Sequence, residues 1–127
     1  MIDTGLKAEC DEVVGSHNTA SSVGSGDMEV FATPSMIALM ERAAMLAVAG
    51  ELPPGSTTVG TLVEVSHVRA TPMGETVRAT AFLEAVEGRR LSFRVEAFDS
   101  RGVIGEGRHE RVVVERERFL AKLSGNN

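Results

Sequence analysis

The amino-acid sequence predicts an α+β fold in which one buried helix packs against a long antiparallel β-sheet. Two observations carry this prediction. Residues 34–49 are apolar at helical spacing on nearly every side, and such a helix is buried by a sheet or by partner chains. From residue 57 onward the apolar residues alternate with polar ones, and short turns separate the strand-like stretches. One helix covering one face of an antiparallel sheet is an α+β layer architecture.

The whole chain of 127 residues, 1–127, is expected to form a single domain. A net charge of −5 and the absence of Trp and Tyr make nucleic-acid binding unexpected. No apolar run approaches the roughly 20 residues of a membrane span. The N-terminal sequence MIDTGLKAECDE lacks the features of a signal peptide. The one cysteine, Cys10, cannot form an internal disulfide, which fits a reducing compartment, so we expect a cytoplasmic protein without membrane contact.

The central helix has recognisable ends. Thr33 and Pro34 are typical of a helix N-cap followed by proline at the first helical position, which predicts a helix over residues 34–49. Gly50 and the LPPG sequence that follows it end the helix.

The remaining elements follow from alternation and turn signals. Strands are expected near residues 6–14, 57–71, 76–87, 90–97 and 103–115, with a short C-terminal helix over 115–123. Short turns such as EGRR (87–90) and DSRG (99–102) should make consecutive strands antiparallel neighbours. The stretch 15–27, rich in Gly, Ser and Thr, is expected to be a flexible loop, either a lid over a site or a plain connection.

Glu41 is the residue that the apolar helix does not explain. Only Glu41 and Arg42 are charged within it, and burying a carboxylate costs several kcal/mol unless it is paired or open to a cavity. The simpler interpretation is that the helix is rotated so that both residues face solvent. The functional one is a site carboxylate that acts as a general base or a nucleophile.

Two further polar residues could join such a site. His67 ends a strand and shares a face with Val63 and Val65. A histidine at such a position is most often simply hydrogen-bonded. Within reach of a carboxylate it forms an acid–base pair instead. Thr33 caps the helix in the simpler interpretation, and at a helix N-terminus its hydroxyl can also face an oxyanion.

Gly60 and the sequence His109-Glu110-Arg111 are less specific. Gly60 interrupts a β-branched strand, which marks either a bulge or the close approach of a ligand or another backbone. His109 and Arg111 share one face of the last strand, as a site wall, a dimer contact or, by default, a solvated edge. The sequence contains no metal-binding cluster, phosphate-binding loop or serine-hydrolase motif, so no metal or cofactor is expected.

Four stretches together resemble a known family. VFATPSMIALMERAAMLAV, GTLVEVSHVRATPMG, LEAVEGRRLSFRVEAFD and GEGRHERVVVERERFLAKL resemble, in order and spacing, the fluoroacetyl-CoA thioesterase-like branch of the hotdog-fold thioesterases. The likeness runs from about residue 30 to residue 123. It implies a hotdog fold, in which a curved antiparallel sheet wraps one long central helix.

The resemblance also implies a function. It indicates an acyl-CoA thioesterase that acts as a homodimer without a metal, and CoA is then part of the substrate rather than a cofactor. The family's catalytic threonine, glutamate and histidine fall on Thr33, Glu41 and His67. Its backbone-donor glycine falls on Gly60, and Arg111 would support the site.

The acyl group is less well defined. The helix residues Met36, Ile37, Met40 and Ala44 are expected to line a pocket for a small or medium acyl group. The fluoroacetyl-CoA enzyme carries lid phenylalanines before its helix, whereas SSVGSGDMEV here has none, so fluorine selectivity is not implied.

The catalytic set poses a geometric problem. Thr33 and Glu41 are eight residues apart, which is about 12 Å of rise on one helix. Either the site is shared across a dimer, or Thr33 lies on a folded-back loop before the helix. Two other functions stay open: a hydratase or dehydratase acting on an acyl thioester, and a non-catalytic acyl-CoA-binding dimer.

Overall fold

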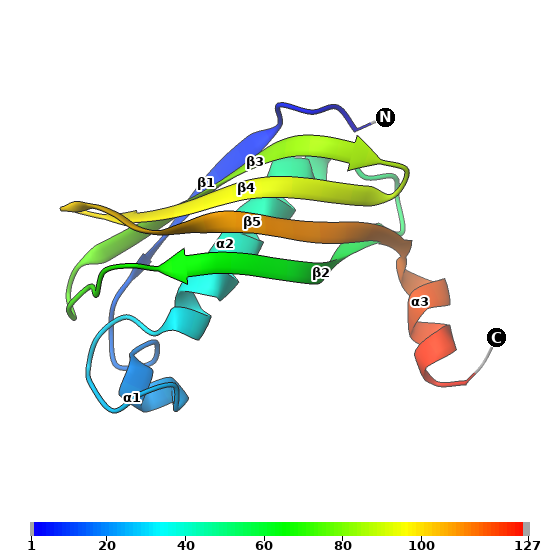
Figure 1. The fold of residues 1–127 in the computed structure, drawn as a ribbon. Coiled ribbons are helices and arrows are strands. Elements are labelled where there is room, and N and C mark those ends of the chain that lie inside the picture. Colours follow the sequence, from blue (N-terminus) through cyan, green and yellow to red (C-terminus); the bar gives the residue numbers. More distant parts are fainter. Residues whose placement is uncertain (1, 126–127) are drawn as a thin grey trace.

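One sheet curves around one long helix in the computed structural model, which describes residues 2–125 (Figure 1). The strands are β1 (Lys7–Val13), β2 (Ser56–His67), β3 (Thr76–Glu87), β4 (Arg90–Asp99) and β5 (Gly102–Glu115). The helices are α1 (Ala20–Val23), α2 (Thr33–Val48), the 3₁₀ turn η1 (Ala49–Glu51) and α3 (Arg116–Leu123). This element order confirms the predicted α+β architecture with a short C-terminal helix.

The strand order across the sheet is β1-β3-β4-β5-β2, and every neighbouring pair is antiparallel. The tight turns predicted between β3, β4 and β5 are confirmed. The expectation that β2 and β3 are neighbours is wrong. β2 lies at one edge of the sheet and β3 lies next to β1 at the other edge, so residues 68–75 cross the sheet between them. This connection is held by the segment before α2, since the backbone N–H of Phe31 donates to the carbonyl of Thr71 at 2.9 Å. β2 is therefore an edge strand.

Helix α2 begins one residue earlier than predicted. The N-cap is Ala32, which has no side-chain capping bond, and Thr33 is already helical, with proline next to it. Thr33 is therefore not the capping residue that the sequence suggested, and its hydroxyl is free to serve another partner.

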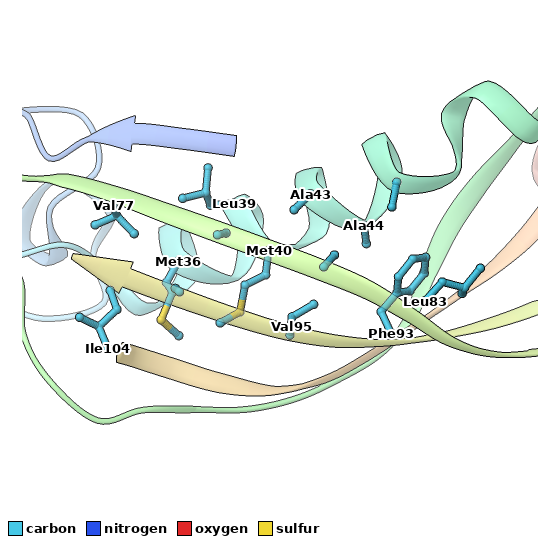
Figure 2. Close-up of a cluster of buried hydrophobic side chains, with 14 of the residues drawn as sticks. Met36, Leu39, Met40, Ala43, Ala44, Val77, Leu83, Phe93, Val95 and Ile104 are labelled. Atoms are coloured by element: carbon cyan, nitrogen blue, oxygen red, sulfur yellow. The ribbon is translucent and has the colours of Figure 1, made fainter. Parts of the chain in front are cut away.

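The core lies between α2 and the inner face of the sheet (Figure 2). Helix residues that face the sheet are fully or almost fully buried: Met36, Leu39, Met40, Ala43, Ala44, Ala47 and Val48. They pack against strand residues that include Val77, Leu83, Phe93, Val95 and Ile104. The expectation that Met36, Met40 and Ala44 line an acyl pocket is wrong, because their side chains fill this core.

The opposite side of α2 is not covered. Met45 and Leu46 are 45% and 50% exposed, although the sequence predicted a helix buried on nearly every side. Within this chain, the sheet covers one face of the helix and leaves the other apolar face to solvent.

The stretch expected to be a flexible loop contains ordered local structure. Helix α1 has a capping box between Thr19 and Ser22. Asn18 is buried and donates from its side-chain amide to the carbonyl of Val13 and to the carboxylate of Glu12, while its oxygen accepts from the N–H of Gly15. These bonds fix the segment to the end of β1.

No helix among residues 2–125 is long and apolar enough to cross a membrane.

Candidate active site

The five residues that the sequence singled out fall into two groups in one chain. Thr33 and His67 contact each other at the start of α2 and the end of β2. Glu41, Gly60 and Arg111 form the second group, farther along the same helix and strand. The structure brings together the members of each group but does not bring the two groups together.

The first group is a hydroxyl–imidazole pair. Thr33 Oγ1 lies 2.7 Å from His67 Nδ1, which is a short hydrogen bond. Both residues line an open cleft of about 240 Å³. Ala20, Ser25 and Val30 form another part of its lining, so the segment before α2 is a wall of this cleft rather than a plain connection.

His67 has one ring nitrogen without a partner. Its Nε2 is buried and no described residue hydrogen-bonds to it. Burial lowers the pKa of His67 below the usual histidine value, and the nearby backbone of Arg69 opposes this only in part. The imidazole is therefore neutral at physiological pH, with a nitrogen that can accept or donate a proton.

The second group is centred on the Glu41 carboxylate. Its Oε2 lies 3.5 Å from Arg111 Nη1 and 3.9 Å from His109 Nε2, and the side chain is 37% exposed. Arg42 alone turns to solvent, where it pairs with Glu12 at 3.7 Å. The simpler interpretation, in which both charges of the helix face solvent together, is therefore wrong for Glu41.

Gly60 provides the space for that carboxylate. A Cβ atom built on Gly60 would lie 2.8 Å from Glu41 Oε2 and 3.3 Å from Arg111 Nη1. The register between β2 and β5 shifts between Gly60 and Leu62, so the bulge predicted for a strand glycine is present as well. The proposed role of the Gly60 N–H as an oxyanion donor stays a prediction.

Arg111 is buried and held by neutral groups. Its Nε donates to Thr58 Oγ1 at 2.8 Å, its Nη2 to the Thr58 carbonyl at 3.0 Å, and its Nη1 to His109 Nε2 at 3.1 Å. Burial lowers the pKa of Arg111, and the Glu41 carboxylate opposes that shift. The guanidinium is thus a fixed cation beside Glu41.

His109 lies in the site, although the sequence analysis took a solvated edge as its default. That default is wrong, because His109 is 1% exposed and its ring stacks on Phe93 with centroids 6.2 Å apart. Strand register could have found it. His109 and Arg111 pair with Phe93 and Leu91, which belong to the apolar inner face of β4.

The separation of Thr33 and Glu41 is now fixed by the helix. Both residues lie in α2, so about 12 Å of rise separates them. The alternative in which Thr33 lies on a loop before the helix is wrong. A substrate atom that contacts both a threonine and a glutamate of this kind must therefore meet Thr33 of one chain and Glu41 of another.

Comparisons with known proteins identify the family. A sequence model of fluoroacetyl-CoA-specific thioesterases matches residues 14–117. The fluoroacetyl-CoA thioesterase of Streptantibioticus cattleyicolor is 53% identical over 95 residues, which are 75% of this chain and 68% of that protein. The chain belongs to the fluoroacetyl-CoA-specific thioesterase family.

Solved structures of two thioesterases agree with this family assignment. A structure of fluoroacetyl-CoA thioesterase matches with a TM-score of 0.91 at 42% identity, covering 100% of this chain and 98% of that one. A thioesterase-superfamily protein from Thermus thermophilus matches with a TM-score of 0.89 at 32% identity, covering 98% and 92%. The hotdog fold and acyl-CoA thioesterase activity, a thioester hydrolysis, are thereby confirmed. No observation favours a hydratase or a non-catalytic binding protein.

Proposed function

We propose that this thioesterase hydrolyses a small or medium acyl-CoA at a site shared between two subunits. Thr33 and His67 of one chain would act with the partner's Glu41. The observation that carries this proposal is that the Thr33–His67 pair and Glu41 form two separate groups, because Thr33 and Glu41 lie eight residues apart in helix α2. Each chain then offers two incomplete halves, which two-fold symmetry joins into two equal sites.

The surface of the chain supports a homodimer. β2 lies at the edge of the sheet, with β5 on one side and no strand of this chain on the other, and its Val63 is 40% exposed. Met45 and Leu46 add exposed apolar surface on the neighbouring face of α2. Exposed edge strands and contiguous apolar surface are the features that a partner chain covers.

The positions of the site residues favour one symmetry axis. A two-fold axis that places Thr33 opposite the partner's Glu41 passes near Ile37, midway between positions 33 and 41. An antiparallel pairing of two β2 strands that places Gly60 opposite the partner's His67 has its midpoint at Val63 and Glu64. Ile37 and Val63 are both apolar and incompletely buried in one chain. A dimer that forms both pairs therefore needs one axis that passes close to Ile37 and to the midpoint between Val63 and Glu64.

The chemistry follows from the groups in this shared site. The N-terminus of α2 and the Gly60 amide would stabilise the oxyanion that forms on the thioester carbonyl. Glu41 would attack the carbonyl carbon to form an anhydride, or take the proton of a water that attacks it. The carbon–sulfur bond then breaks and CoA leaves as a thiolate. In the first route water cleaves the anhydride, and the neutral His67 beside Thr33 would take the proton of that water and pass it to the thiolate. In the second route the proton taken by Glu41 would pass to the thiolate through His67. Arg111 would hold the carboxylate in place.

The size of the cleft suits a short acyl chain. A solved relative, 44% identical with a TM-score of 0.87 over 93% of this chain and 99% of that one, is described in complex with fluoroacetate and CoA. The cleft of about 240 Å³ beside Thr33 and His67 is small for a binding pocket. Fluoroacetyl-CoA therefore belongs among the first substrates to test. We place the protein in the cytoplasm, where acyl-CoA is available and Cys10 stays reduced.

Thiol release tests the proposal directly. The purified protein, Glu41→Gln and the exposed control Glu51→Gln would be assayed with acetyl-, fluoroacetyl-, propionyl-, butyryl-, phenylacetyl- and benzoyl-CoA. We expect turnover of one or a few thioesters by the unmodified protein and the control only. Activity that survives in Glu41→Gln would remove Glu41 from the chemistry. Single turnover in ¹⁸O-water then tests for a nucleophile, because ¹⁸O enters Glu41 only when water attacks the Glu41 carbon of an anhydride.

Mixed dimers test the shared site. Thr33→Val and Glu41→Gln each inactivate every site in their own dimers. Random mixing makes half of the dimers mixed, and each mixed dimer holds one intact site of two, so about a quarter of the activity returns. If all three residues act within one chain, mixing restores nothing.

A further inference from the structure

We propose that His109 is a positioning residue, which accepts one hydrogen bond from Arg111 Nη1 and so holds this guanidinium at a fixed distance from Glu41. The inference rests on the proposed role of Glu41 in hydrolysis. It gives a role to a residue that lies outside the family's catalytic set.

The contacts of His109 fix its protonation. Nδ1 lies 2.7 Å from the Leu62 carbonyl, which can only accept, so Nδ1 carries the proton. Nε2 lies 3.1 Å from Arg111 Nη1, which can only donate, so Nε2 carries none. His109 is therefore a neutral imidazole with one defined tautomer. Burial lowers its pKa, as does the Arg111 charge, while the hydrogen bond to Leu62 and the carboxylates of Glu41 and Glu110 oppose this.

The donors of Arg111 are divided among three partners. Nε and Nη2 donate to Thr58, which occupies one edge of the guanidinium. Nη1 carries two N–H groups: one donates to His109 at 3.1 Å, and the other faces Glu41 at 3.5 Å. The bond to His109 fixes the position of Nη1. A close charge-assisted pair has N–O distances of about 2.7–2.9 Å. Glu41 is thus held by one long contact.

This arrangement matters for the reactivity of the carboxylate. A guanidinium in close two-bond contact would occupy both oxygens of the Glu41 carboxylate. With His109 fixing the position of Nη1, Arg111 orients the carboxylate while leaving lone pairs of Glu41 free for water or substrate. A residue that only filled the core beside Phe93 would not need an acceptor nitrogen at this point.

Two substitutions separate the two nitrogens of His109. In His109→Asn the amide nitrogen can occupy the place of Nδ1 and keep the bond to Leu62, but nothing accepts from Arg111. In His109→Gln the longer side chain places its oxygen near Nε2 and keeps the acceptor for Arg111. A purely structural role would make the two variants similar, whereas the positioning role makes the Asn variant the worse one.

The expected results concern kcat and KM. In His109→Asn, kcat falls by about 10- to 100-fold, since misplacing a reacting group by about 1 Å can cost 10²-fold in rate. KM changes little. His109→Gln recovers most of the lost kcat. Arg111 and the neutral His109 both face Glu41 from β5.

Controls keep the inference separate from the proposed function. His17→Asn makes the same chemical change at an exposed histidine, and thermal unfolding checks that each variant is folded. Equal losses of kcat in both His109 variants would overturn the positioning role, as would full activity in both.

A second readout does not depend on turnover. The ¹³C signal of the Glu41 carboxyl carbon at neutral pH, assigned by comparison with Glu41→Gln, should shift in His109→Asn and return in His109→Gln. An unchanged signal in His109→Asn overturns the inference even if the enzyme is active. Absence of thiol release from the unmodified protein overturns the proposed function instead.

Discussion

Replacing Gly60 by alanine should damage catalysis without damaging the fold. The added methyl carbon would lie 2.8 Å from Glu41 Oε2, whereas ordinary contact begins at about 3.4 Å, so the carboxylate must retreat by roughly 0.6 Å. Gly60 is not among the glycines with positive φ, so the backbone accepts alanine. The displaced atom ends a flexible side chain, which makes the movement cheap.

The magnitudes follow from these distances. Misplacing a reacting group by about 1 Å can cost 10²-fold in rate, so we expect kcat to fall by about 10- to 100-fold. Alanine at a compatible glycine position restricts the unfolded chain and stabilises by about 0.4–1 kcal/mol, which offsets the cost of moving Glu41. The free energy of unfolding should therefore stay within about 1 kcal/mol of the unmodified protein. The N–H of residue 60 is retained, so the loss reports on Glu41 rather than on an oxyanion donor.

Thiol release and urea unfolding measure the two effects. Gly50→Ala is the matched control, because a Cβ atom there meets nothing within 4 Å, and it should change neither quantity. Gly107→Ala is the opposite control, because its Cβ would lie 2.0 Å from the Glu64 carbonyl oxygen and should prevent folding. Gly60→Ala with kcat within about two-fold of the unmodified protein would refute the placement of Glu41 as the reacting carboxylate.

Three further predictions follow from the site and the sheet. Thr33→Val removes the partner of His67 Nδ1 and should lower kcat by about 10-fold or more. Thr33→Ser keeps the hydroxyl and should keep most of the activity. Equal losses of kcat in both variants would show that the hydroxyl plays no part. Burial acts to raise the pKa of Asp99, but the Arg101 N–H, Thr71 and the guanidiniums of Arg69 and Arg101 hold it below its usual value. Because the folded pKa is depressed, this stability is present at neutral pH and is lost below about pH 4. Asp99→Asn should therefore cost about 1–3 kcal/mol in urea unfolding at pH 7 and little at pH 2; an equal cost at both would contradict this assignment. Dialysis against EDTA should leave thiol release unchanged, and a loss restored by a divalent ion would show that a metal takes part.

The sequence predicted the elements better than their neighbours. Alternation located β3, β4 and β5 because each has one face in the core and tight turns between them. It misplaced β2, because the partner of a strand after a long connection depends on packing that local sequence does not encode. His109 was missed for a related reason. A polar residue in a strand is predicted to be exposed, and only the strand register shows that His109 lies opposite the inward-facing Phe93.

The anomaly of Glu41 has the same origin as the exposed apolar face of α2. The sheet buries one side of the helix with Met36, Leu39 and Met40, so a second apolar side can only be covered by another chain. Glu41 lies at the border between these two sides, where Gly60 leaves room for its carboxylate and the Arg111 guanidinium lies beside it. A carboxylate placed there is neither buried at full cost nor free in water. In a dimer it would face the helix start of the partner, where the hydroxyl–imidazole pair has a buried nitrogen still without a partner.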